Sequence, residues 1–538
     1  MKAKALIFLG LGLVGVAGCS PGDTNLNIST VDNSVDNSSS GGGSNNPCAA
    51  YLDPTTGATR QGSFDGTNCT YSTAFAGAAN PITVDLEIPF ISGVHIFQDS
   101  LFMGENVNTG TAAAGGTGPT LTIQAGNTLA FSDASDYLLI NRGASILANG
   151  SPTAPITLTG FTDAVSGTAS PEAVQLWGGV IINGNGITNN CTDAQRVSND
   201  CHVLAEGQPS NYGGNDNSES SGTIRYVVVK HAGFEVAPGD EINGVTFNAV
   251  GSGTTVENLE VYSAYDDGIE FFGGAVNVTN YLALYVRDDS IDFSDGYVGT
   301  IQNALVIQSQ MDGNRCVEGD GIGESRYVGG ESPETALPLT NPTINNMTCI
   351  MNGGDVGTHS DTSEGPTLRR GPRFTINNSI IAAIYGANAA DSNECLEITN
   401  DEDELAAQNG ESVISNTIIA CTDEPTKGTF AGTPALNGDT VAQWLLNAST
   451  NGATYAANVG NYIDQDVTTG NQVIFEANSY YTIPGNAFVD GDGTPMAIPA
   501  TGDAAGTPMG AVYRSNDWTA NWTYGLHVGN RGQALWFE

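Results

Sequence analysis

The chain has 538 residues and a formal net charge of −42, from 58 acidic and 16 basic side chains. This acidic excess excludes nucleic acid as a natural partner, because binding a phosphate backbone requires many basic side chains. Glycine is frequent, at 69 residues, beside many asparagine, threonine and valine residues, which indicates β-structure with many tight turns.

The N-terminus has the pattern of an export signal. Lys2 and Lys4 precede an uncharged apolar run from Ala5 to Ala17. This run is short for a membrane span, and small residues follow it, as at a signal cleavage site. We therefore expect residues 1–18 to be a secretory signal peptide.

Cys19 follows Val16-Ala17-Gly18, and this arrangement resembles the lipobox of bacterial lipoproteins. The resemblance implies cleavage before Cys19 and lipid attachment to it, and Ser20 resembles the sorting signal for the outer membrane. We expect a protein held in that membrane by its lipid, exposed at the cell surface or released. The alternative is an ordinary cleaved signal with an incidental cysteine. Residues 19–47, rich in serine, asparagine and glycine, should form a flexible tether.

The other eight cysteines are consistent with an exported protein. Their even number, without C-x-x-C or C-x-x-C-H, indicates disulfides rather than zinc or c-type haem. Sequential pairing is the simplest arrangement, because each pair then closes a short loop. The first pair places a disulfide-containing N-terminal cap at residues 48–119. The expected pairs are Cys48–Cys69, Cys191–Cys201, Cys316–Cys349 and Cys395–Cys421.

An asparagine recurs at a fixed place in six short segments. Each segment has a β-branched residue, a spacer, the asparagine and a short apolar run, as in Val256-Glu-Asn258-Leu. The first two intervals are 22 and 23 residues, and loop insertions account for the longer ones. Stacked asparagines can hydrogen-bond through their amides and tolerate a bent corner. The predicted structural ladder contains Asn258, Asn280, Asn303, Asn346, Asn378 and Asn416.

A period near 22 residues without a helical pattern is typical of a parallel β-helix, whose coils share one core. We predict an all-β fold, a right-handed parallel β-helix (solenoid), over residues 120–425. Residues 426–538 should form a small C-terminal capping region. It would contain a short helix from Asp439 to Ala456, with Asp439 as a possible N-cap. The aromatic residues expected to cover the open end, or alternatively to bind a sugar, are Trp518, Trp522, Tyr524 and Trp536.

Several blocks resemble a family of large secreted or surface β-helix proteins that are widespread in aquatic Gram-negative bacteria. The central block, from Tyr265 to Gly274, carries the most specific resemblance, and the likeness extends over roughly residues 120–538. It implies the fold and the export route. It implies no reaction, because it supplies no catalytic residues to carry over. The other matching blocks are Leu121–Thr159, Trp177–Ile182, Asn243–Thr255 and Gly510–Trp518.

Acidic residues recur eight, nine, twelve and fifteen positions after the ladder asparagines. If the coils stack in register, these carboxylates form columns, and charges about 4.8 Å apart repel by roughly 3.5 kcal/mol at an effective dielectric of 20. Dense carboxylate oxygens suit Ca²⁺; the alternatives are that each aspartate caps its own turn, or that some are catalytic. The predicted ligands are Asp266, Asp267, Asp288, Asp289, Asp292, Asp312 and Asp355, and further column members are Glu270, Asp295, Glu318 and Asp361.

Two functions remain open. The first is a non-catalytic surface protein with a binding, adhesive or structural role, stabilised by calcium, that contacts a surface polysaccharide or another exported protein. The alternative is a calcium-dependent lyase or hydrolase of acidic polysaccharide. The predicted fold is similar to that of pectate-lyase-like enzymes, where calcium on aspartates neutralises a uronate and an arginine or lysine removes a proton. That similarity implies Arg287 or Arg315 for the proton transfer; the chain has no G-x-S-x-G or H-E-x-x-H motif.

Overall fold

The computed structural model describes residues 46–77, 79–106, 118–208, 210–309, 312–353, 363–385, 394–421, 426–430, 436–464, 510–512 and 517–526. The chain divides into two units, residues 1–45 and 46–538, and the described residues all belong to the second. The signal peptide, Cys19, Asp355, Asp361 and Trp536 lie outside the described residues. Within the described part, no helix is both long enough and apolar enough to cross a membrane.

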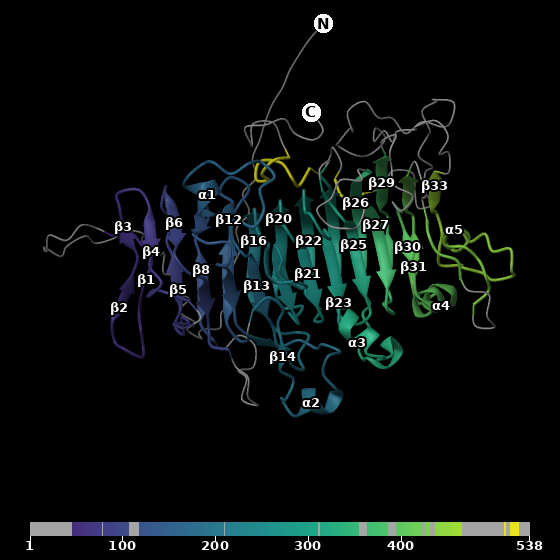
Figure 1. The fold of residues 1–538 in the computed structure, drawn as a ribbon, viewed down its shortest axis with the longest axis horizontal. Coiled ribbons are helices and arrows are strands. Elements are labelled where there is room, and N and C mark those ends of the chain that lie inside the picture. Colours follow the sequence, from purple (N-terminus) through teal and green to yellow (C-terminus); the bar gives the residue numbers. More distant parts are fainter. Residues whose placement is uncertain are drawn as a thin grey trace, which may run out of the picture. The chain divides into compact units, whose positions relative to one another are not determined.

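Strands of successive coils pair in parallel and lie side by side in the second unit (Figure 1). Nine of them form one sheet, here called the site sheet. Its strands are β7 (Leu101–Met103), β10 (Leu138–Ile140), β13 (Val180–Asn183), β19 (Val245–Asn248), β21 (Ile269–Phe272), β23 (Ile291–Ser294), β25 (Arg315–Asp320), β27 (Glu364–Arg369) and β30 (Glu397–Ile398).

A second sheet of 18 strands, here called the ladder sheet, contains the asparagine segments. Its strands are β3 (Ser63–Phe64), β4 (Cys69–Tyr71), β5 (Leu86–Ile88), β6 (Val94–Phe97), β8 (Thr120–Ile123), β9 (Thr128–Phe131), β11 (Ser145–Asn149), β12 (Ile156–Gly160), β16 (Gly222–Lys230), β20 (Thr255–Tyr262), β22 (Asn277–Leu284), β24 (Thr300–Ile307), β26 (Thr343–Gly353), β28 (Thr375–Asn377), β29 (Ile380–Tyr385), β31 (Val413–Ser415), β32 (Ile418–Cys421) and β33 (Tyr462–Asp464).

Short hairpins and helices project from the coils. The hairpins are β1 (Ala50–Leu52) with β2 (Thr59–Gln61), β14 (Val203–Leu204) with β15 (Asn211–Tyr212), and β17 (Phe234–Ala237) with β18 (Asp240–Ile242). The helices are α1 (Phe161–Ala164), α2 (Asp193–Val197), α3 (Glu324–Val328), the 3-10 helix Pro333–Thr335, α4 (Asp401–Asn409) and α5 (Val441–Leu445).

The predicted parallel β-helix is confirmed, and residue register explains why it forms. Val256 of β20 lies beside Val278 of β22, which lies beside Ile301 of β24. Equivalent β-branched residues therefore stack from coil to coil and bury one face of each strand against a shared core.

The first four ladder asparagines each lie inside a long strand, and Asn378 and Asn416 each lie between two consecutive strands. All six have a left-handed backbone, with φ between 48° and 61°, a conformation that asparagine tolerates better than most residues. The Asn280 amide donates to Asn258 Oδ1 at 3.0 Å, and the Asn303 amide donates to Asn280 Oδ1 at 2.8 Å. The ladder continues through Asn346 and Asn378. One residue type thus stabilises both the bend and the stacking of coils.

Aromatic rings stack along the inside of the coils. The rings of Phe247 and Phe271 lie 5.3 Å apart, and those of Phe271 and Tyr297 lie 4.2 Å apart, both nearly parallel. These side chains are essentially inaccessible to solvent. The core therefore runs continuously behind the site sheet and keeps its strands in fixed register.

The predicted disulfides are confirmed, with the sequential pairing. Each of the four bonds joins two cysteines that follow one another in the described part of the sequence. The pairs are Cys48–Cys69, Cys191–Cys201, Cys316–Cys349 and Cys395–Cys421.

The expected C-terminal helix is much shorter than predicted. It spans only Val441–Leu445, and Thr440 rather than Asp439 is its N-cap, in a capping box with Gln443. Asp439 instead accepts a hydrogen bond from the Tyr455 hydroxyl at 2.8 Å. This carboxylate is therefore used to fold the following loop back onto the helix.

The C-terminal aromatic residues also differ from the prediction. Trp518 and Tyr524 pack on an apolar patch formed by residues of the ladder sheet, including Tyr262 and Leu282. The Tyr524 backbone N–H donates to the buried Glu260 carboxylate at 2.7 Å. These aromatics cover the side of the middle coils rather than the open end. β20 and β22 carry apolar residues on their outer face, and the sequence pattern did not distinguish these residues from those of the core.

Candidate functional site

Three carboxylates stand in a row across the site sheet. Glu270 of β21 pairs in register with Asp292 of β23, which pairs with Glu318 of β25. Their strand neighbours Ile269 and Phe271 are buried in the core, so the alternation of a strand turns the acids to the other face. We call Glu270, Asp292 and Glu318 the floor acids.

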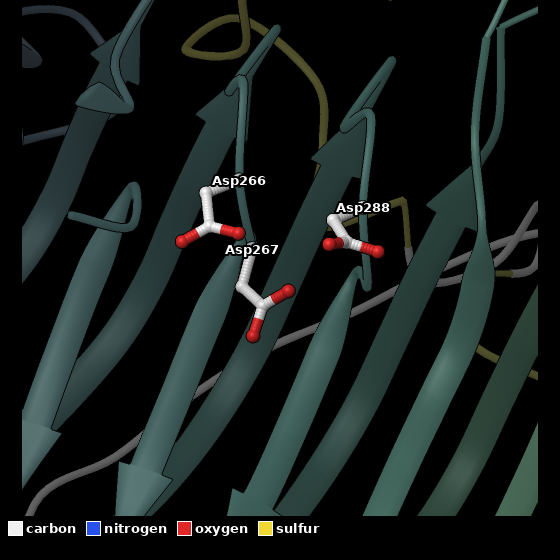
Figure 2. A group of neighbouring side chains, drawn as sticks. All are labelled: Asp266, Asp267 and Asp288. Atoms are coloured by element: carbon white, nitrogen blue, oxygen red, sulfur yellow. The ribbon is translucent and has the colours of Figure 1, made fainter. Parts of the chain in front are cut away.

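Four more acids occupy the turns that lead into β21 and β23. Asp266, Asp267 and Asp288 gather at these turns, as Figure 2 shows. The Asp267 carboxylate accepts a hydrogen bond from the Asp289 backbone N–H at 3.0 Å, and the Asp289 carboxylate accepts one from the Arg315 backbone N–H at 2.8 Å. Within this column each carboxylate therefore accepts a backbone hydrogen bond from the next coil, whereas the predicted alternative to metal binding was that each aspartate caps its own turn.

The prediction that Asp312 continues this column is wrong. Arg315, not Asp312, follows Asp289 in the column, because the third coil has three more residues between its asparagine and its site strand, as the pairing of Asp292 with Glu318 shows. Asp312 instead lies 3.5 Å from Arg287 Nε. Because of this insertion, the later acids no longer follow their ladder asparagine at the spacing that the earlier coils show.

Three groups of these acids are close enough to share a cation. In each group, one oxygen from every carboxylate lies within 4.8 Å of the others. Like charges at that distance repel by roughly 3.5 kcal/mol at an effective dielectric of 20, so a bound cation would stabilise them. The groups are Asp266, Asp267 and Asp288; Asp267, Glu270 and Asp292; and Asp289, Asp292 and Glu318.

Burial opposes ionisation of these acids. Removal from water raises the pKa of Asp267, Glu270 and Asp292 well above the usual range, and neighbouring carboxylates raise it further. Burial also raises the pKa of Glu318, to about 7, although Arg369 and Arg315 act against it. Asp292 Oδ1 is buried and accepts no hydrogen bond from the described residues. Carboxylate oxygens are hard donors, and here they have too few positive neighbours to balance their charge. Such a group is suited to binding a calcium ion.

A groove of about 780 Å³ lies over the floor acids. Strands β21, β23, β25 and β27 line its base, and hairpin β14–β15 and helix α3 contribute its walls. Its volume is within the range of ligand-binding pockets. The floor acids are therefore accessible to a ligand even though the individual side chains are largely covered.

Arginines enter the same groove from later coils. Arg369 pairs with Glu318 and, at 2.9 Å, with Asp320, and Arg370 also pairs with Asp320. Arg326 of α3 lies 3.0 Å from Asp295. Arg369 and Arg370 thus pair with acids at the β25 end of the row of floor acids, and Glu270 of β21 lies at the opposite end.

The two arginines suggested as proton acceptors are already engaged. Arg315 Nη1 lies 2.8 Å from Glu318 and its Nε lies 3.3 Å from Glu364. Arg287 contacts Asp312 and donates to the Glu172 carbonyl at 3.2 Å. A guanidinium held by carboxylates keeps its proton, which argues against either residue as a base.

The sequence did not identify the groove walls or the positions of the arginines in them. Arg326 and Arg369 reach the site from a loop helix and from a coil with a long insertion, so no fixed offset relates them to the floor acids. Glu206 also lines the groove, and burial raises its pKa to about 7. The only available signal was the clustering of arginines in the later coils.

A family model described as a pectate-lyase-like β-helix domain matches residues 107–462. This match covers more than half of the chain. The chain belongs to this family. No curated protein and no solved structure gives a match. As a pectate-lyase-like β-helix, the protein carries its floor acids within the matched region; the resemblance to surface proteins of aquatic bacteria stays a prediction.

Proposed function

We propose that the protein is a lipid-anchored surface protein that binds acidic polysaccharide in the groove through calcium held by the floor acids. The observation that carries the proposal is the position of Asp292. It belongs to two of the three-carboxylate groups and has a buried oxygen that no described residue hydrogen-bonds. A divalent cation there would satisfy that oxygen and present positive charge to a uronate.

A role in binding rather than cleavage is favoured by the groove arginines. Arg369 and Arg370 form ion pairs with their carboxylate partners. The surrounding acids raise the pKa of Arg369 above its usual value. Such groups attract and orient an anionic chain but do not accept a proton at neutral pH. Binding therefore needs only these side chains and the calcium ion that the floor acids would hold.

Calcium titration of the purified protein tests this proposal. We expect Ca²⁺ to raise the melting temperature and to be required for binding of polygalacturonate, an acidic test polymer. The variant Asp292→Asn should lose polymer binding and most of the calcium-dependent rise in melting temperature, whereas Asp216→Asn, an exposed turn acid outside the groove lining, should retain both. Polymer binding that is unaffected by chelator or by Asp292→Asn would refute the proposal.

Membrane anchoring is tested separately in the producing cell. We expect Cys19→Ser to move the protein from the membrane fraction to the soluble fraction, because the lipid is attached to that sulfur. Unchanged membrane association of Cys19→Ser would exclude the lipid anchor.

Cleavage of the same polymer is the second candidate, and the family match favours it. Paired carboxylates in a groove could serve hydrolysis or elimination. Lyase action would release unsaturated uronides, and hydrolysis would release reducing ends. If neither product appears from acidic polysaccharides with calcium present, the enzymatic alternative is excluded for those substrates.

A further inference from the structure

A second carboxylate cluster lies on the site sheet beyond the groove. Glu364 opens β27, Glu397 opens β30, and Glu394 precedes β30 on the same coil. Gly365 donates its backbone N–H to the Glu394 carbonyl at 2.7 Å, and Thr367 lies in register with Glu397. The stacking of two coils thus brings three glutamates together. None of them lines the groove among the described residues.

The three glutamates are buried, and one has an unused ligand atom. Glu364, Glu394 and Glu397 are 6%, 1% and 8% exposed. The Glu394 side chain is therefore removed from solvent almost completely, yet its Oε2 accepts no hydrogen bond from the described residues. A buried anionic oxygen without a donor is costly, and it points to a ligand that the protein itself does not supply.

The spacing of the oxygens matches one cation. One oxygen from each glutamate lies within 4.8 Å of the other two. Oxygens bound to a single Ca²⁺, at about 2.3–2.6 Å each, are separated by at most about 5 Å. The cluster therefore has the size of a half-formed calcium coordination shell.

Lys427 occupies the approach to this cluster. Its Nζ lies 3.2 Å from Glu394 Oε1 and 3.1 Å from Glu397 Oε1. The lysine side chain is 45% exposed, so its long stem can swing outward without opening the core. On the opposite side, Glu364 contacts Arg315 Nε at 3.3 Å. The Lys427 ammonium and the Arg315 guanidinium thus partly balance three carboxylates.

We propose that Glu364, Glu394 and Glu397 form a second divalent-cation site, separate from the groove, in which Lys427 holds the place of the ion until calcium displaces it. The site ties β27 to β30, close to the Cys395–Cys421 disulfide. Its occupant is a hard cation such as Ca²⁺, because all three side-chain donors are carboxylate oxygens.

Calorimetric titration of the full chain with CaCl₂ alone tests the site. Lys427→Met should tighten one calcium equivalent by about tenfold, because a competing positive charge is removed. Lys427→Arg keeps the charge and is the matched control, with no expected tightening. Glu394→Gln should lose one equivalent while it retains the equivalents that Asp292→Asn removes.

The outcomes separate this site from the groove. If Lys427→Met binds calcium as the wild type does, or if Lys427→Arg tightens binding equally, the placeholder role is refuted. Should Glu394→Gln fail to fold, the two lysine variants still decide the question, because Lys427 is partly exposed. A loss of calcium in Asp292→Asn with no response to any change at Glu394 or Lys427 would refute this site and leave the groove proposal intact.

Discussion

Glu219 illustrates at the scale of one residue how burial changes the charge state of this acidic protein. It is only 6% exposed, and its carboxylate accepts the Gly251 backbone N–H. Burial raises its pKa from 4.5 to about 7, although that hydrogen bond acts in the opposite direction. Between these values the folded state holds a proton that the unfolded state has lost, so this group makes stability fall as pH rises.

Replacing Glu219 should remove that part of the pH dependence. Glu219→Gln keeps an oxygen for the Gly251 N–H but cannot ionise. We expect wild type to lose about 3 kcal/mol of unfolding free energy between pH 5 and pH 8 through this group, and the variant to avoid this loss. Urea denaturation at several pH values measures the difference, and parallel curves for the two proteins would contradict it.

The asparagine corners act at the scale of the strand. Asn280 both donates to Asn258 and accepts from Asn303, with its backbone at φ 61°. It therefore contributes two amide hydrogen bonds and tolerates a conformation that costs most residues about 1–2 kcal/mol. These two contributions can be separated by substitution.

Asn280→Ala should lower the unfolding free energy by about 2–4 kcal/mol, because it loses the ladder bonds and strains the corner. Asn280→Gly is the control, since glycine loses the same bonds but adopts positive φ freely. We expect its loss to be smaller by about 1–2 kcal/mol in urea denaturation. Equal losses would show that the backbone conformation is not important at this corner.

Disulfides act on the loops between elements. Cys316 of β25 and Cys349 of β26 are 33 residues apart, whereas Cys191 and Cys201 are 10 apart. Replacing the first pair with alanines should cost about 3–4 kcal/mol, and replacing the second about 1 kcal/mol less, because the longer loop gains more entropy on unfolding. Denaturation of both double variants compares them. A larger loss for the short loop would contradict the loop-entropy explanation.

Net charge acts on the whole molecule. The chain carries −42 formal charges, and many acids of the site sheet lie close together. Self-repulsion of this size destabilises a folded chain, and salt screens it over a Debye length of about 30 Å at 0.01 M and about 3 Å at 1 M.

Salt should therefore stabilise the protein. We expect the melting temperature to rise by about 2–5 °C between roughly 0.01 M and 1 M NaCl. CaCl₂ at equal ionic strength should raise it further, because bound ions add to screening. A melting temperature that does not respond to NaCl would show that close ion pairs already balance the repulsion.

The sequence predicted what depends on short-range repetition. The asparagine interval reveals the coil, because each coil uses the same bend and the same buried strand; Cys48 and Cys69 pair as expected because a short loop joins them. The carboxylate column was predictable only for two consecutive coils. Asp312 departs from it, since an insertion of three residues changes the register without changing the local pattern.

The amino-acid order by itself determined the parallel β-helix, the neighbouring disulfides and the asparagine ladder, because all three depend on residues close in sequence or repeated at a nearly constant interval. Only the tertiary structure decided the groove, its arginines and the position of the C-terminal aromatics. Arg369 reaches Glu318, and Tyr524 reaches Glu260, across stacked coils joined by loops of unequal length. Contacts of that kind depend on how far each loop shifts the register, which residue spacing alone does not specify.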